Sequence, residues 1–125
     1  MSSKQNPKLI AIVDDDESVQ SALQDLLEAD GLSARSFGSA EEFIESGLQH
    51  KAGCLILDIR MPGMSGPELQ ARLKTDRLNI PIIFITAHGD TRIRMQAMRE
   101  GATEFLTKPF DDQVLLNLVR AALNM

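Results

Sequence analysis

The chain has 125 residues, enough for one domain with a single hydrophobic core. Its hydrophobic fraction of 43% and charged fraction of 25% are ordinary for a globular protein, and its net charge of −5 argues against direct nucleic-acid binding by this domain. No apolar run approaches the roughly 20 residues that span a bilayer, so no membrane segment is expected. The single cysteine, Cys54, lies in an apolar run, which favours a packed, reduced thiol and a cytoplasmic location.

The first third of the chain predicts strand, helix and strand in that order. Residues 1–8 are polar, lack the apolar segment of a signal peptide, and are expected to form a loose tail. Leu9–Val13 is wholly apolar and predicts a buried strand. Acidic residues follow, and apolar residues at helical spacing then predict a helix that Asp16 can cap and Gly31 can end. Residues 32–37 form a weaker pattern, typical of an edge strand.

The middle third contains two helix-start patterns on either side of a short apolar run. Ser39–Glu42 and Ser65–Glu68 both match the capping box, in which a serine and a glutamate three residues later satisfy each other's backbone N–H groups. Gly47 loosens the end of the first, short helix. Between the two helices, Cys54–Leu57 predicts a buried strand that ends at Asp58.

The last third repeats the alternation of strand and helix. Ile82–Ile85 predicts a strand that ends at Thr86, and a helix is expected over Thr91–Glu100 with a thin apolar stripe. Thr103–Thr107 predicts the last strand, and an amphipathic pattern from Val114 predicts a final helix. The expected N-caps of these two helices are Asp90 and either Asp111 or Asp112.

Five strands that alternate with five helices predict an α/β fold. Right-handed crossovers between successive strands give a parallel sheet with helices on both faces. We expect a doubly wound, flavodoxin-like sheet in the order 2-1-3-4-5. In such sheets, ligands bind outside the carboxyl ends of the strands.

Three carboxylates are expected at that edge, from Asp14, Asp15 and Asp58. Like charges so close raise carboxylate pKa values, and a bound divalent cation relieves the repulsion. An all-oxygen donor set without clustered histidine or cysteine favours Mg²⁺, or Mn²⁺ in its place, over Zn²⁺. The alternative is that residues 14–17 only cap and solvate the helix that follows.

A carboxylate beside a metal can also act as a nucleophile and accept a phosphoryl group, which gives an acyl phosphate at Asp58. The transfer requires neutralisation of charge, for which Lys108 supplies a cation and Thr86 a hydroxyl donor. Each of these two residues is a weak indication alone. Their placement directly after successive strands carries the prediction.

Four segments resemble response-regulator receiver domains: Val13–Asp15, Leu57–Gly66, Ile85–Ala87 and Thr107–Phe110. They occur in the family's order, and the resemblance covers essentially the whole chain, 1–125, as one receiver domain. It implies that Asp58 is phosphorylated by a sensor histidine kinase or a phosphotransfer protein in a two-component phosphorelay. The implied role is that of a signalling domain whose only chemistry is its own phosphorylation and dephosphorylation.

The resemblance also implies roles around Asp58. Asp15 and Asp58 would ligate Mg²⁺ directly together with the backbone carbonyl of Arg60, and Asp14 would act through metal-bound water. Lys108 would pair with the phosphoryl group or, before phosphorylation, with Asp58.

Further implied features concern switching. Thr86 would swing toward the phosphoryl oxygen, beside the backbone of Ala87, and Phe105 would follow it as the switch aromatic of the last strand. The alternative is that Phe105 is simply a core residue. A cis peptide bond is expected at Lys108–Pro109.

Outside the central site, the spacing of Arg60 and His88 suggests that they flank the phosphoryl group and set its lifetime, which dephosphorylation rates of alanine variants would test. The alternative for His88 is a surface-loop residue without such a role. Residues 91–123 form the face that such receivers commonly use for partner contact, and we expect weak dimerisation that phosphorylation strengthens.

The segment 86–90 is similar to receivers found with helix-turn-helix DNA-binding domains, so the chain is either a single-domain regulator or part of a longer one.

Three other functions are weighed against this prediction. A Mg²⁺-dependent phosphatase with an aspartyl nucleophile generally needs a second acid two residues later, where this chain has Arg60. A flavodoxin-like binding module needs a phosphate-binding loop after the first strand, where this chain has acidic residues that repel anions. A degenerate receiver that never takes phosphate is the third, although all five site residues are present.

Overall fold

The computed structural model describes residues 9–87 and 89–125 of the chain. The expected loose tail, residues 1–8, and the expected lifetime-setting residue His88 therefore lie outside the described residues.

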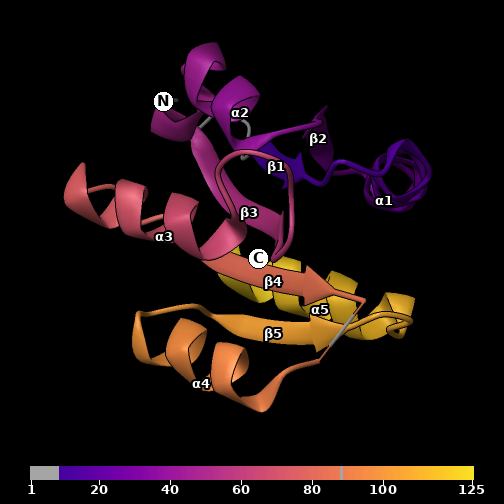
Figure 1. Cartoon of the computed structure of the whole chain (residues 1–125). Helices are drawn as coiled ribbons and strands as arrows, with labels where there is room; N and C mark the ends of the chain where they lie inside the picture. The colour runs from indigo at the N-terminus through magenta and orange to yellow at the C-terminus, as the bar shows by residue number, and fades with distance from the viewer. Residues whose placement is uncertain (1–8, 88) are drawn as a thin grey trace.

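Strands and helices alternate along the described chain, as the sequence predicts (Figure 1). The elements are β1 (Leu9–Val13), α1 (Glu17–Ala29), β2 (Ser33–Phe37), α2 (Ala40–Ser46), the 3₁₀ helix η2 (Leu48–His50), β3 (Ala52–Asp58), α3 (Gly66–Thr75), β4 (Ile82–Thr86), α4 (Thr91–Arg99), β5 (Glu104–Thr107) and α5 (Asp112–Ala122). No helix in the described part of the chain combines the length and apolar character needed to cross a membrane.

Within the described residues, five parallel strands form one sheet in the order β2-β1-β3-β4-β5. The doubly wound 2-1-3-4-5 prediction is confirmed. The central strand β3 ends at Asp58, which pairs in register with Ile85, one residue before the end of β4. The carboxyl ends of β1, β3, β4 and β5 therefore lie along one edge of the sheet.

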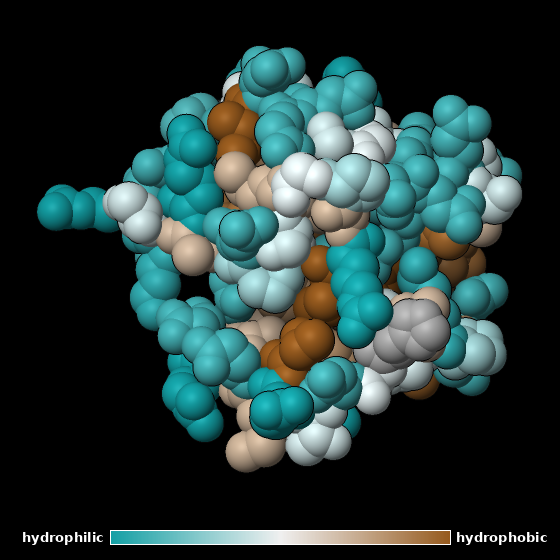
Figure 2. All heavy atoms as spheres, viewed as in Figure 1, coloured by the Kyte–Doolittle hydropathy of each residue, from teal (hydrophilic) through white to brown (hydrophobic). Residues whose placement is uncertain are grey.

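Helices cover both faces of the sheet and bury two separate cores. Alternate strand residues such as Leu57 and Phe84 pack with α2, α3 and α4. Their neighbours, such as Ile56 and Ile85, pack with α1 and α5. Strands buried on both faces explain the continuous apolar runs in the sequence. Seen from the side shown in Figure 2, the surface is mostly hydrophilic, with small apolar areas between the elements.

The helix starts follow the predicted caps, with one difference. Asp16, Asp90 and Asp111 are the N-caps of α1, α4 and α5, and Ser65 forms a complete capping box with Glu68. At α2 the box is only half formed. The hydroxyl of Ser39 accepts from the N–H of Glu42 at 3.0 Å, but the Glu42 carboxylate accepts from Gly38 at 2.7 Å.

A few boundaries and side-chain orientations differ from expectation. β3 begins at Ala52, two residues early, because pairing with β1 extends beyond the apolar run. In α5, Val114, the first residue of the predicted apolar pattern, is exposed, whereas Leu116 is buried. Gly47 ends α2 in the left-handed region at φ 76°, and Leu48 belongs to the 3₁₀ turn that follows.

Candidate functional site

The carboxylates of Asp14, Asp15 and Asp58 converge at the carboxyl edge of the sheet. Asp14 and Asp15 directly follow β1, and Asp58 is the last residue of β3. Each residue offers an oxygen, and these atoms all lie within 4.8 Å of one another. Asp14 is fully buried and Asp58 nearly so, whereas Asp15 is exposed. The cluster is therefore open to solvent on the side of Asp15.

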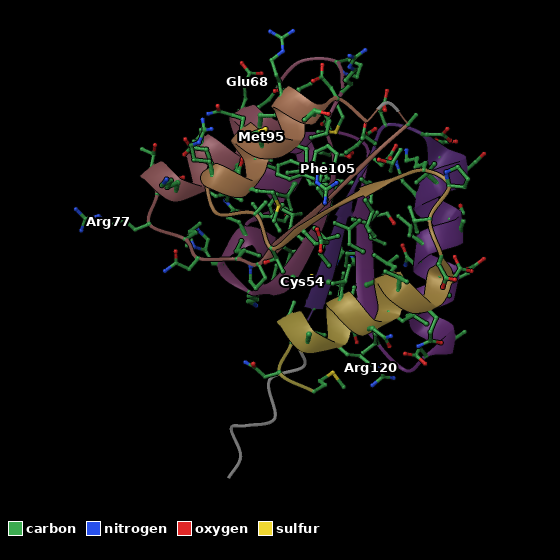
Figure 3. All side chains as sticks on the ribbon, turned by 90° about the horizontal axis from the view of Figure 1, so that it is seen from below. Cys54, Glu68, Arg77, Met95, Phe105 and Arg120 are labelled. Carbon is green, nitrogen blue, oxygen red and sulfur yellow. The ribbon has the colours of Figure 1, made fainter. Side chains whose placement is uncertain are left out.

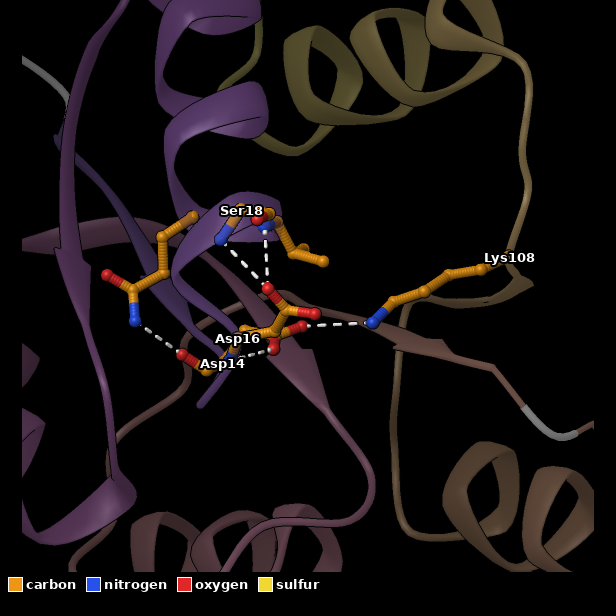
Figure 4. A network of polar contacts seen from close by, with 6 residues as sticks. Asp14, Asp16, Ser18 and Lys108 are labelled. Atoms are coloured by element: carbon orange, nitrogen blue, oxygen red, sulfur yellow. Dashed lines mark hydrogen bonds and ion pairs between the residues drawn. The ribbon is translucent and has the colours of Figure 1, made fainter.

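Asp14 is held by contacts from several elements (Figure 4). Its Oδ1 accepts from the N–H of Asp16 at 2.8 Å, and its Oδ2 pairs with Nζ of Lys108 at 3.1 Å. Its main-chain carbonyl accepts from Nε2 of Gln20 at 2.7 Å, and its N–H donates to the carbonyl of Phe37 at 3.1 Å. The carboxylate is thus fixed in position before any ligand binds.

Lys108 enters the site from the segment between β5 and α5. Its N–H donates to the carbonyl of Thr86 at 2.7 Å, and the bond between Lys108 and Pro109 is cis, as expected. The resemblance led us to expect an ion pair with Asp58 in the unphosphorylated chain. The ion pair instead joins Lys108 to Asp14, because the carboxylate of Asp14 is fully buried and cannot be left without a compensating charge.

The electrostatics of the cluster disfavour a negative charge on Asp58. Burial of the side chain raises the pKa of Asp58, and the negative charge of Asp14 raises it further. The positive charge of Lys108 and hydrogen bonds from the N–H groups of Arg60 and Ile59 act in the opposite direction without cancelling the rise in pKa. The repulsion that the sequence predicts at Asp58 is therefore present.

The donor set fits a hard divalent cation. Three carboxylates contribute oxygen ligands close enough to share one ion. Mg²⁺ and Mn²⁺ prefer oxygen ligands, and a doubly charged ion would compensate the like charges that raise the pKa of Asp58. The acidic residues of this cluster can therefore bind a metal.

Thr86 lies at the same edge as the carboxylates. It is the last residue of β4, is 2% exposed, and pairs in register with Thr107 of β5. Ala87 follows it and is exposed, so its backbone lies at the surface of the site. Arg60 is exposed and begins the segment between β3 and α3. The structure thus groups Asp14, Asp15, Asp58 and Lys108, and it places Thr86 and Arg60 at or just after the carboxyl ends of β4 and β3.

Phe105 belongs to the core in this structure. Its side chain is 5% exposed, and its ring centroid lies 6.2 Å from that of Phe84, with the ring planes tilted by 43°. In Figure 3, Phe105 lies within the body of the domain, whereas Arg77 projects from its surface. An inward Phe105 agrees with a core role and equally with the resting position of a switch residue.

Two supporting residues were not singled out from the sequence. Gln20, one turn after the N-cap of α1, holds the carbonyl of Asp14. Gly66 packs its backbone directly against the carbonyl of Asp58, where a Cβ would collide with that oxygen. The contact of Gly66 with Asp58 could have been suspected from the sequence, because a glycine directly follows the N-cap Ser65. Nothing in the sequence indicates the contact of Gln20 with Asp14.

The chain matches the family model described as the response regulator receiver domain over residues 10–120. The fold and the acidic site agree with this match, and the chain belongs to the receiver-domain family of two-component signalling.

The curated relatives include a response regulator and a nodulation protein. The chain is 46% identical over 117 residues to the response regulator protein TodT of Pseudomonas putida, covering 94% of this chain and 52% of TodT. It is 45% identical over 114 residues to nodulation protein W of Bradyrhizobium diazoefficiens, covering 91% of this chain and 50% of that protein. The chain thus spans about half the length of the curated relatives it matches.

Solved structures agree with this assignment. The response regulator StyR superposes with a TM-score of 0.88 at 46% identity, covering 94% of this chain and 60% of StyR. The crystal structure of FixJ-N superposes with a TM-score of 0.84 at 38% identity, covering 94% of both chains.

Proposed function

We propose that the chain is a phosphorylation-switched receiver in which Asp58 accepts a phosphoryl group from the phosphohistidine of a sensor kinase or phosphotransfer protein. The observation that carries this proposal is the convergence of Asp14, Asp15, Asp58 and Lys108 at the carboxyl edge of the sheet. Membership in the receiver family supports it. We treat residues 1–125 as one receiver domain on the same grounds.

The proposed cofactor is Mg²⁺, with Mn²⁺ as a substitute. Asp15, Asp58 and the backbone carbonyl of Arg60 would hold it directly, and Asp14 through water. When bound, the cation supplies charge neutralisation between the carboxylates and the incoming phosphoryl oxygens.

In the proposed transfer, a carboxylate oxygen of Asp58 forms a bond to phosphorus while the bond from phosphorus to the imidazole nitrogen of the donor histidine breaks. The electron pair of the broken bond stays on the imidazole nitrogen. With the cation compensating the charge of Asp14, Lys108 then exchanges its contact with Asp14 for one with a phosphoryl oxygen. The hydroxyl of Thr86 and the N–H of Ala87 donate to the other phosphoryl oxygens.

The proposed switch begins with this contact of Thr86, which exists only in the phosphorylated state and can therefore shift a conformational equilibrium. A shift of Thr86 toward the phosphoryl group changes the packing beside β5, where Phe105 lies against Phe84. Phe105 has no hydroxyl, so its coupling rests on ring packing alone. We further propose that Arg60 and His88 set the lifetime of the acyl phosphate, which dephosphorylation rates of their alanine variants would measure.

The proposed output face is residues 91–123. It carries exposed arginines on α4 and exposed aspartates at the start of α5, which favour salt bridges across a two-fold axis. We propose that this face forms a homodimer. We also propose that the chain is joined to an output domain in a longer protein. A cytoplasmic location is proposed because it suits the free, buried thiol of Cys54.

Incubation with acetyl phosphate and MgCl₂, followed by intact mass measurement, tests the proposed function. Wild type should gain the mass of one phosphoryl group. Asp58→Asn should gain none, and Asp15→Asn should gain it at least tenfold more slowly because a metal ligand is lost. Asp25→Asn, an exposed carboxylate on α1, is the matched control and should behave as wild type. An unmodified wild type, or an Asp58→Asn variant labelled as fully as wild type, would refute the proposal.

A further inference from the structure

The segment between β3 and α3, residues 59–65, is tied to a helix that contributes no residue to the proposed site. The N–H of Met64 donates a hydrogen bond of 2.9 Å to Oε2 of Glu41. Glu41 lies in the first turn of α2. The bond therefore connects two elements that are distant in sequence.

The same carboxylate also lies against the preceding residue, Gly63. A Cβ at this position would lie 2.7 Å from Oε2 of Glu41 and 3.2 Å from Oε1. Gly63 has a φ of +77°, in the left-handed region that favours glycine. The backbone conformation therefore favours glycine at this position, and a Cβ there would force the Glu41 carboxylate to shift.

Other hydrogen bonds lie at the ends of the segment, and the side chain of Met61 packs into the core between them. At its start, the N–H of Ile59 donates to the carbonyl of Ile85 at 3.3 Å, and at its end the N–H of Ser65 donates to Oε1 of Glu68 at 2.8 Å. Arg60, near the start, follows Asp58 by two residues, and its backbone N–H favours the charged form of that carboxylate by lowering its pKa. Glu41 acts between these anchors, at Gly63 and Met64.

We propose that Glu41 is a positioning residue for the metal site. Its hydrogen bond to Met64 restrains the loop, so that the backbone of Arg60 stays beside the carboxylates in the conformation that binds Mg²⁺. The ion then does not have to order the loop on binding, which improves its affinity. This inference rests on the proposed function, because Arg60 is a ligand only by that proposal.

Titration of MgCl₂ alone into the unphosphorylated chain, followed by calorimetry, tests the inference. We expect Glu41→Ala to bind Mg²⁺ roughly fivefold more weakly than wild type, the effect of one lost hydrogen bond. Glu41→Gln keeps an acceptor oxygen and should bind within about twofold of wild type. Glu42→Ala is the matched control. It removes the same charge from the same helical turn, but its carboxylate bonds to Gly38 and not to the loop.

Amide hydrogen exchange gives a second measurement that needs no metal. The Met64 amide should exchange faster in Glu41→Ala than in wild type or Glu42→Ala, while the amides of β3 stay protected in all three. Equal Mg²⁺ affinities in wild type and a folded Glu41→Ala, or equal losses in both alanine variants, would overturn the inference and leave the proposed function intact. A wild type that binds no Mg²⁺ would overturn both.

Discussion

At the residue scale, Asp58 is a carboxyl group whose ionised form is destabilised by the fold. Burial and the charge of Asp14 raise the pKa of this carboxyl above its ordinary value of 3.8, so the folded chain holds the proton more tightly than the unfolded chain does. The resulting destabilisation is absent at low pH and grows as the pH rises through and above 3.8. Burial also raises the pKa of Cys54, to about 12, and the thiol therefore remains a packed, neutral group.

Asp58→Asn should therefore stabilise the chain in metal-free buffer at neutral pH. The amide keeps an acceptor oxygen for the N–H groups of Ile59 and Arg60 and removes the charge. We expect the free energy of unfolding to rise by roughly 1 kcal/mol, a common size for one substitution. Added MgCl₂ should stabilise wild type more than the variant.

Urea denaturation with and without MgCl₂ measures both effects. Asp25→Asn, the exposed control on α1, should leave both values within about 0.5 kcal/mol of wild type. A loss of stability in metal-free Asp58→Asn would contradict the electrostatic argument.

At the element scale, helix α3 is fixed to the site by its first residues. The capping box of Ser65 and Glu68 satisfies the first N–H groups of the helix. Gly66 donates its N–H to the carbonyl of Ile59 at 3.0 Å and lies against the carbonyl of Asp58 and the ring of Phe84. The start of α3 and the end of β3 are therefore packed backbone to backbone.

Gly66→Ala should force these two backbones apart. A Cβ at Gly66 would meet main-chain atoms that cannot rotate away, so we expect a loss of about 1–3 kcal/mol in the free energy of unfolding. Gly38→Ala is a suitable control, because its Cβ would meet side-chain atoms no closer than 3.6 Å. Urea denaturation of the two variants should separate them, and equal stabilities would show that α3 adjusts freely.

At the scale of the whole molecule, the large exposed apolar side chains of 91–123 lie on α4 and α5. Met95 is 55% exposed and Val114 45%, and arginines surround Met95 on α4. Apolar side chains among exposed charges suit a surface that is covered only in one state. Figure 3 shows Met95 on α4 and Arg77 beyond the end of α3, on a different part of the surface.

We expect the chain to be mainly monomeric without phosphate and to dimerise when beryllium fluoride, a stable phosphoryl mimic, is bound with Mg²⁺. Met95→Glu should weaken this dimer at least tenfold by placing a charge in its interface, without changing phosphorylation of Asp58. Arg77→Glu, outside the face, should dimerise as wild type does. Sedimentation velocity measures the association, and a monomeric wild type with the mimic bound would contradict the prediction.

The sequence by itself determined the alternation of elements, the sheet order, most helix starts and the positions of the site residues at strand ends. The elements and helix starts follow from periodicity and caps, which are local signals, and the sheet order follows from the known preference of alternating α/β chains for doubly wound sheets. Only the tertiary structure decided that Lys108 pairs with Asp14, that Glu41 holds the loop at Met64, and that Val114 faces outward. Such contacts depend on how loops and helices approach one another in space. The choice between neighbouring partners rests on small free-energy differences, which do not produce a recognisable pattern in the sequence.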